Sequence, residues 1–200
     1  SALMTARLSG HLTADLPDRN LALTEGPDGT PAIRPPPEVA ERLNAISLEE
    51  MSTDKYFTLV FAEVALETGR VRLVQAGHPH PVVQRADGAL EQVGCGGVPV
   101  GLIDGAGFDE ACFTLAPGDR LLIVSDGITE CEAPGGMMLE EDGLRGILRR
   151  NAGLAGPEFL EAMTWELASF ADTEDFGDDV SAVLFEYGGP PAPPSAEPGP

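Results

Sequence analysis

The chain has 200 residues, of which 42% are hydrophobic and 22% are charged, a balance that suits one globular domain with a sizeable core. With 33 acidic against 12 basic residues the formal charge is −21, which argues against nucleic acid and anionic membranes as partners and favours a divalent cation. Three cysteines without metal-ligand spacing are too few for a disulfide framework and favour a reducing, cytoplasmic setting, and no apolar run is long enough to span a membrane.

The N-terminal part is predicted to contain two amphipathic helices joined by a loop. Leucines at near-helical spacing predict a helix over residues 2–14. Residues 17–37 are rich in proline, glycine and aspartate and predict a long surface loop. Residues 38–51 carry apolar side chains one turn apart and predict a second helix, with Pro37 at its first turn.

The next segment is predicted to be two hairpins. Residues 56–67 and 71–76 read as antiparallel strands joined at Thr68-Gly69, the second with one face in water because arginines alternate with aliphatic residues. Residues 82–85 and 90–93 are expected to form another pair of strands around the turn at 86–89.

Two motifs next to these strands invite a ligand hypothesis. His78 and His80 are separated by one residue on an extended chain, so they face opposite ways and are not expected to chelate one metal together. The glycine-rich stretch 94–101 could cradle a phosphate, but no Gly-Lys-Ser/Thr follows it, and a packed loop is favoured.

An apolar run over residues 121–124 ends in Ser125-Asp126-Gly127 and predicts a strand buried on both faces. We expect this strand to pair with residues 109–115 through the Pro117-Gly118 turn, and Gly127 to let the backbone bend sharply after the acid. Asp126 at the rim of a core needs a cation, a hydrogen-bond cluster or a metal, although it could simply cap a turn.

The C-terminal part is predicted to hold two helices and a last strand. Helices are expected near 140–150 and from Pro157 onward, with Trp165 at the edge of the buried stripe. Asp178 and Asp179 then stand at the start of a buried strand that ends near residue 187. Residues 188–200 contain only Gly, Pro, Ala, Ser and one Glu and predict a disordered tail.

If the two acid-bearing strands are antiparallel neighbours, their carboxylates meet at one edge of a sheet. Carboxylates suit Mg²⁺ or Mn²⁺, and two such ions could activate a water for hydrolysis. The alternative is that the acidic stretch 172–179 is a solvated loop. Chemistry through an aspartyl phosphate is excluded, because Val124 occupies the position of the nucleophilic aspartate.

Four motifs in order resemble one family, the metal-dependent protein phosphatases of the 2C type, in the bacterial branch of the sporulation protein IIE that regulates sigma-factor antagonists. The resemblance covers residues 1–187, and its motifs are Ala76-Gly77-His78-Pro79, Gly97-Val98-Pro99-Val100-Gly101-Leu102, Pro117-Gly118-Asp119-Arg120-Leu121 with Ser125-Asp126-Gly127-Ile128-Thr129-Glu130, and Asp178-Asp179-Val180-Ser181.

The resemblance implies an α+β fold, an α-β-β-α sandwich of two antiparallel sheets flanked by helices. It implies that Asp126 and Asp178 ligate two Mn²⁺ or Mg²⁺ ions, that Gly127, Asp179 and His78 line the site, and that a metal-activated water attacks phosphoserine or phosphothreonine. The implied partners are a phosphorylated protein of the anti-sigma-factor antagonist type and an upstream sensor or receiver domain. A homodimer is compatible with the resemblance.

The family's Asp-x-x-Gly-His-Gly element, whose aspartate bridges both metals, has no counterpart in these residues. We therefore expect a domain over residues 1–187 that is truncated at its N-terminus and lacks its first metal-binding strand. This leaves two hypotheses open, an active serine/threonine phosphatase and a catalytically impaired, phosphatase-like binding module.

Overall fold

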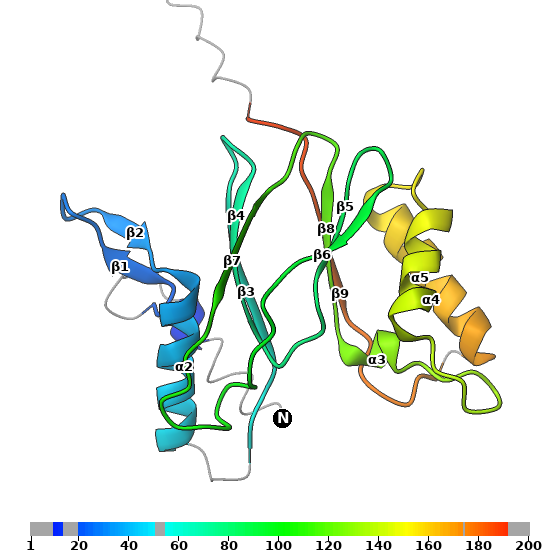
Figure 1. Ribbon diagram of the computed structural model, residues 1–200, viewed down its shortest axis with the longest axis horizontal. Helices are drawn as coiled ribbons and strands as arrows, with labels where there is room; N and C mark the ends of the chain where they lie inside the picture. The colour runs from blue at the N-terminus through cyan, green and yellow to red at the C-terminus, as the bar shows by residue number, and fades with distance from the viewer. Residues whose placement is uncertain (1–9, 14–19, 51–54, 174, 192–200) are drawn as a thin grey trace, which may run out of the picture.

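The computed structural model describes residues 10–13, 20–50, 55–173 and 175–191. Two antiparallel sheets lie face to face, with helices on both outer sides (Figure 1). This arrangement confirms the expected α-β-β-α sandwich. Most of the predicted first helix over 2–14, and residues 192–200 of the predicted tail, lie outside the described residues.

Both sheets are built from strands that are neighbours in space and antiparallel. The first sheet has the order β3-β4-β7, with β3 at Leu59–Ala65, β4 at Arg70–Ala76 and β7 at Glu110–Thr114. The second has the order β6-β5-β8-β9, with β5 at Val82–Gln84, β6 at Leu90–Gln92, β8 at Arg120–Val124 and β9 at Ala182–Glu186. The predicted hairpins, β3–β4 and β5–β6, are confirmed.

The space between the sheets is filled by aliphatic side chains from both of them. Val71 and Leu73 of β4 are fully buried and belong to the same cluster as Val83 of β5 and Leu121 of β8. Burial of each such side chain contributes about 1.5–3 kcal/mol, so this cluster is what holds the sheets together.

Helix α2 (Pro36–Glu50) covers the outer face of the first sheet. Its Val39 and Leu43 are buried in one cluster with Val74 and Ala76 of β4. The helix therefore confirms the predicted amphipathic stripe, but it also covers the second half of β4. The expectation that one face of this strand is in water is wrong there, because α2 supplies an apolar cover that β4 does not encode by itself.

Helices α4 (Glu140–Arg150) and α5 (Gly156–Ala171) cover the outer face of the second sheet. Both carry the buried stripes that were predicted, and Trp165 lies off the stripe with 71% of its surface exposed. A single helical turn, α3 (Asp126–Thr129), was not predicted. The buried residues of the two longer helices are Leu144, Ile147, Leu148, Phe159, Met163 and Leu167.

The predicted pairing of residues 109–115 with 120–125 is wrong, because β7 and β8 belong to different sheets. The turn between them carries the chain across the sandwich and is held by Asp119, which is buried. One carboxylate oxygen of Asp119 accepts from the backbone N–H of Ala86 at 2.9 Å, and the other accepts from the N–H of Ala116 and from Arg85 Nη1. These bonds direct β8 toward β5.

Two further expectations are corrected by the structure. The predicted loop 17–37 contains a hairpin of β1 (Leu23–Glu25) and β2 (Pro31–Ile33), whose short strands carry too few apolar residues to be seen as a pattern. Strand β9 was expected to be buried, but it lies at the edge of its sheet and Val183 is 61% exposed.

In the part of the chain that the structure describes, no helix is long and apolar enough to cross a membrane.

Candidate metal centre

The pairing of β8 with β9 brings Asp126 and Asp178 to the same end of the sheet. The register aligns Val124 with Ala182, so the residues after β8 and the residues before β9 leave the ladder together (Figure 1). The antiparallel arrangement on which the prediction depended is therefore present. We call the surface formed by Asp126, Asp178 and Asp179 the carboxylate edge.

Ser125 joins the two acid-bearing segments. Its backbone N–H donates to the carbonyl oxygen of Ser181 at 2.9 Å, and its hydroxyl accepts from the N–H of Ser181 at 2.9 Å. The hydroxyl also lies 2.9 Å from the carbonyl oxygen of Asp179. Ser125 was not among the predicted site residues, although its hydroxyl, directly before Asp126, is the signal that could have identified it.

Glycine is required at position 127 because the backbone of Asp179 passes close to it. The chain does turn sharply here, from β8 into α3, but the φ of Gly127 is not among the positive values of the described chain, so the turn itself does not require a glycine. A Cβ at this position would lie 2.6 Å from the carbonyl oxygen of Asp179 and 3.1 Å from its carbonyl carbon. Only a residue without a side chain lets the segment before β9 pass so near to α3.

The carboxylates of this edge face solvent. Asp126, Asp178 and Asp179 are all exposed, and in the described part of the chain none of them pairs with a basic side chain. One oxygen of Asp126 accepts from the N–H of Gly127 at 3.0 Å, and one oxygen of Asp178 accepts from the N–H of Asp179 at 2.7 Å. These local bonds orient the carboxylates and leave oxygen donors of the type that Mg²⁺ and Mn²⁺ prefer.

The described residues contain no group of three His, Cys, Asp or Glu side chains that could hold a metal ion. The donors at the edge fit a hard cation in kind, but they come from two segments only. A metal ion at this edge would therefore need further ligands besides Asp126 and Asp178, and their role as ligands stays a prediction.

His78 lies in the segment that leads from β4 to β5. Its Nδ1 is 3.0 Å from the carbonyl oxygen of Pro79, and its own carbonyl oxygen accepts from Gln75 Nε2 at 2.6 Å. These contacts fix the segment, while the role of His78 at the carboxylate edge stays a prediction. His80 makes a different contact, with its Nδ1 3.3 Å from the carbonyl oxygen of Val93.

The glycine-rich stretch is a packed loop, as the sequence favoured. The buried amide of Gln75 accepts from the N–H of Gly96 at 2.9 Å, and Asn44 of α2 accepts from the N–H of Gly101 at 2.7 Å. A Cβ at Gly97 would lie 2.9 Å from the carbonyl oxygen of Gln75. The glycines therefore serve close packing against β4 and α2.

Comparison with known proteins decides the family. The family model for the stage II sporulation protein E (SpoIIE) matches residues 1–188. The chain belongs to the SpoIIE family. This confirms the resemblance to the sigma-factor-regulating branch of the 2C-type phosphatases that the four motifs indicated.

A curated relative of this SpoIIE-family chain is the phosphoserine phosphatase RsbU of Bacillus subtilis, which is 21% identical over 150 residues. The match covers 74% of this chain and 44% of RsbU. A second curated relative is Protein IcfG of Synechocystis sp., of which the match covers only 24%. The chain therefore corresponds to a part of each of these two relatives.

Solved structures show the same fold. The SiaA-PP2C domain of Pseudomonas aeruginosa superposes with a TM-score of 0.68 at 17% identity, over 78% of this chain and 62% of that one. A manganese-presoaked phosphatase domain of SpoIIE from Bacillus subtilis gives a TM-score of 0.56 at 22% identity, over 78% and 66% of the two chains. At these identities the similarity establishes the 2C-type fold.

Proposed function

We propose that this protein is a metal-dependent serine/threonine phosphatase that hydrolyses phosphoserine or phosphothreonine on a partner protein. The observation that carries the proposal is the β8–β9 pairing, which sets Asp126 and Asp178 at one exposed edge of a SpoIIE-family chain. The name of RsbU as a phosphoserine phosphatase supports the same reaction class.

Asp126 and Asp178 would hold two Mn²⁺ or Mg²⁺ ions together with ligands from outside the described residues. Exposed carboxylates without a basic partner fit such ions, and the manganese-presoaked SpoIIE structure supports manganese as the metal. When bound, the ions supply Lewis-acid polarisation of the phosphoryl group and activation of a water.

The chain's own residues set the geometry of this edge. Ser125 holds the segment of Asp178 and Asp179 against the end of β8, and Gly127 allows that segment to pass close to α3. Asp179 and His78 would line the site without ligating the metals directly. Precise spacing of the carboxylates matters, because a displacement of about 1 Å in a catalytic site can cost about 100-fold in rate.

The substrate would be a phosphorylated protein of the sigma-factor antagonist type, as in the branch of the family to which the chain belongs. We further propose that residues 1–187 form the phosphatase domain, that a sensor or receiver domain in the same polypeptide controls it, and that it works in the cytoplasm. The net charge of −21 would repel nucleic acid and anionic lipid, and it favours a protein partner.

The test is phosphate release from a phosphoserine peptide by the full-length protein with Mn²⁺. Asp126→Asn and Asp178→Asn should each abolish the Mn²⁺-dependent release, because each removes a charged ligand. Asp104→Asn is the matched control, since Asp104 is exposed and follows Ile103, whose carbonyl oxygen accepts from Asn44 of α2. Undiminished rates in both edge variants would refute the proposal.

A binding module without catalysis is the second candidate. It is favoured by the observation that the described residues bring together no set of three metal ligands. Calorimetric titration of the full-length protein with Mn²⁺ separates the two functions. Tight binding of two ions that is lost in Asp126→Asn supports the phosphatase, and no binding supports the module.

A further inference from the structure

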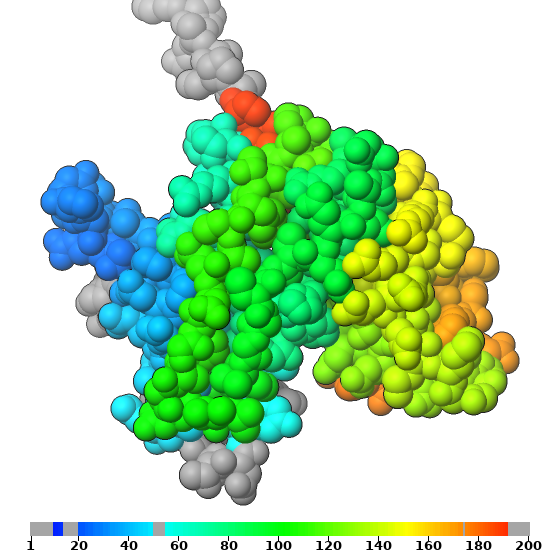
Figure 2. Space-filling model, in the orientation of Figure 1, coloured from blue at the N-terminus to red at the C-terminus, as the bar shows by residue number. Residues whose placement is uncertain are grey.

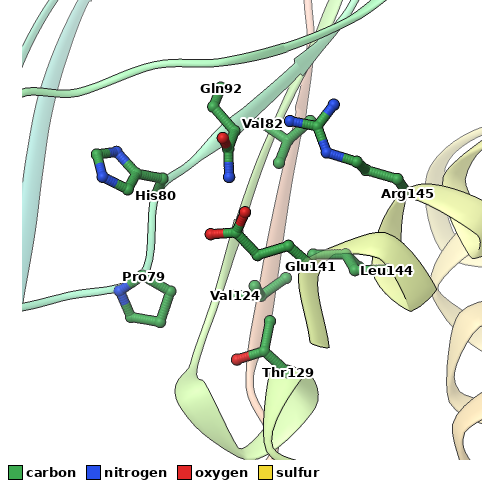
Figure 3. Close-up of a pocket in the computed structure, with 9 residues that line it drawn as sticks. All are labelled: Pro79, His80, Val82, Gln92, Val124, Thr129, Glu141, Leu144 and Arg145. Atoms are coloured by element: carbon green, nitrogen blue, oxygen red, sulfur yellow. The ribbon is translucent and has the colours of Figure 1, made fainter. Parts of the chain in front are cut away.

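A small pocket lies beside the carboxylate edge, between the β5–β6 hairpin and the helices α3 and α4 (Figure 3). Its floor is apolar and buried, and it consists of Val82 of β5, Val124 of β8 and Leu144 of α4. Figure 2 shows α4, in yellow, lying against the green β5–β6 hairpin on the surface of this face. Three of the residues that line the pocket, His80, Gln92 and Glu141, are exposed, so a protein substrate can reach it from the surface.

One residue that lines the pocket belongs to the same helical turn as Asp126. Thr129 lines it and forms the last residue of α3, whose first residue is Asp126. The hydroxyl of Thr129 donates to the carbonyl oxygen of Asp126 at 3.2 Å. A peptide whose phosphoserine sits at Asp126 thus brings a neighbouring residue to this pocket.

Two opposite charges line the pocket without neutralising each other. Glu141 and Arg145 are one turn apart on α4, a spacing that normally favours a salt bridge. Neither of them is in a salt bridge within the described part of the chain. Figure 3 shows the carboxylate of Glu141 directed into the pocket, toward His80 and Gln92, and the guanidinium of Arg145 apart from it.

The backbone before Glu141 is held in an unusual conformation. Glu140 has a φ of 56°, in the left-handed region, where a residue with a Cβ is disfavoured by about 1–2 kcal/mol. Such strain persists where the surrounding structure demands it, and functional sites are enriched in it. Here it sets the first turn of α4, from which Glu141 reaches the pocket.

The side chains of the pocket define the chemistry of its ligand. A carboxylate only accepts hydrogen bonds and a guanidinium only donates them, so a ligand that satisfies both Glu141 and Arg145 must offer a donor and an acceptor. A ligand carboxylate would pair with Arg145 but be repelled by Glu141, and an ammonium would pair with Glu141 but be repelled by Arg145, so each satisfies only one of the two charges. A primary amide on a short apolar stem satisfies both charges and the apolar floor.

We propose that this pocket binds the side-chain amide of an asparagine or glutamine that flanks the phosphoserine of the substrate. This inference rests on the proposed phosphatase function and adds the sequence preference of the same site. Glu141 accepts from the amide NH₂ group and Arg145 donates to the amide oxygen.

The test uses phosphoserine peptides that differ at one flanking position, which carries Gln, Leu, Glu or Lys, scanned over three positions on each side. The Mn²⁺-loaded, full-length protein should hydrolyse the Gln peptide with a kcat/KM about tenfold above that of the other three at one position, as expected for hydrogen bonds to charged groups. Equal values at every position would overturn the inference.

Substitutions on α4 test whether Glu141 and Arg145 cause the preference for the Gln peptide. Glu141→Ala and Arg145→Ala should each reduce the Gln-to-Leu ratio of kcat/KM toward one. Asp142→Ala and Arg149→Ala are matched controls that keep the ratio, because both residues are exposed on the same helix and do not line the pocket. A ratio that survives both pocket variants contradicts the inference.

Failure of the proposed phosphatase function would be recognised separately. If the protein releases phosphate neither from any peptide nor from p-nitrophenyl phosphate, the phosphatase proposal fails. The pocket is then judged by calorimetry with the same peptides. The Gln peptide must bind about tenfold more tightly than the Leu peptide, and equal affinities would refute the pocket independently of catalysis.

Discussion

The hydroxyl of Ser125 donates a hydrogen bond of 2.9 Å to the carbonyl oxygen of Asp179. The same hydroxyl accepts from the N–H of Ser181, so one short side chain at the end of β8 fixes two points of the segment that enters β9. The relative position of the carboxylates of Asp126 and Asp178 therefore depends on a residue that carries no charge.

Replacing Ser125 by alanine should lower the free energy of unfolding by about 1 kcal/mol, because two hydrogen bonds at a partly exposed site are lost. It should also weaken Mn²⁺ binding, since the segment of Asp178 is no longer held against β8. Urea denaturation and Mn²⁺ calorimetry measure the two effects. Ser125→Thr keeps the hydroxyl and should retain both properties, and an unchanged Mn²⁺ affinity in Ser125→Ala would show that the hydroxyl does not position the edge.

Replacing Gly127 by alanine should separate α3 from the segment before β9. The new Cβ would lie 2.6 Å from the carbonyl oxygen of Asp179, a backbone atom that cannot move without shifting Asp178 as well. We expect a loss of about 1–3 kcal/mol in the free energy of unfolding and a loss of Mn²⁺ affinity.

The control for this substitution is Gly107→Ala, because a Cβ at Gly107 meets nothing within 4 Å. Chemical denaturation should place this variant within about 0.5 kcal/mol of the parent. If Gly127→Ala is equally harmless, the close approach has no structural importance.

The buried turn at Asp119 should make stability depend on pH. Burial by itself would raise the pKa of Asp119, but the hydrogen bonds from Arg85 and from the N–H groups of Ala116 and Ala86 outweigh it and hold the pKa below its usual value. A carboxyl whose pKa is lower in the folded state stabilises the fold above the unfolded-state pKa of about 3.9 and loses this contribution as the pH falls through the folded-state value.

Asp119→Asn should therefore lower the free energy of unfolding at pH 7 by about 1–3 kcal/mol, because the amide cannot accept all the hydrogen bonds that Arg85 and the N–H groups of Ala86 and Ala116 donate to the carboxylate. The difference from the parent should shrink below about pH 4, where Asp119 takes up a proton in the unfolded parent but stays ionised in the folded one, and should vanish below the folded-state pKa. Urea unfolding curves at several pH values measure it. A difference that stays constant from pH 7 to pH 3 would exclude the ionised carboxylate as its source.

Arg120 connects the loop between α4 and α5 to the start of β8. Its guanidinium is buried, donates to Gln84 Oε1 at 2.7 Å and to the carbonyl oxygen of Leu154 at 2.6 Å, and lies 4.4 Å from the centre of the Phe159 ring. Arg120→Met leaves these acceptors without a donor and should cost about 3 kcal/mol in the free energy of unfolding.

Thermal or chemical denaturation of Arg120→Met measures this cost against Arg149→Met, a change of an exposed arginine on α4. The control should differ from the parent by no more than about 0.5 kcal/mol. Similar stabilities of the two variants would mean that the buried arginine is replaceable by apolar volume alone.

The sequence predicted those elements whose pattern is local. The amphipathic stripes of α4 and α5 and the two hairpins follow from residue spacing. The antiparallel pairing of β8 with β9 was only a condition of the prediction for Asp126 and Asp178, and the structure supplies it. The partner of β8 was mispredicted, because a proline-glycine turn looks the same whether it closes a hairpin or crosses between sheets. Asp119 decides this through bonds to Arg85 and Ala86, more than thirty residues away.

The charged residues of the candidate site could be predicted from the sequence, but the residues that hold them in position could not. Asp126 and Asp178 stand out as acids at strand ends, whereas Ser125 acts through contacts with residues that only folding brings near. The pocket with Glu141 and Arg145 was missed for the same reason, since α4 contributes to it only by packing against β5 and β8. His78 had a sequence signal, but its contacts in the structure are with Gln75 and Pro79.

The two ends of β9 have different roles: a hydrogen bond between the two sheets lies at one end, and the proposed metal ligand Asp178 lies before the other. Just past its far end, the hydroxyl of Tyr187 donates to the carbonyl oxygen of Leu66 at 2.9 Å and ties the second sheet to the β3–β4 turn of the first. Asp178 stands before the opposite end of the same strand. Asp178 can therefore be substituted, during evolution or in the laboratory, without loss of the hydrogen bond between Tyr187 and Leu66. A single substitution at the carboxylate edge should change the chemistry of the site and preserve the fold.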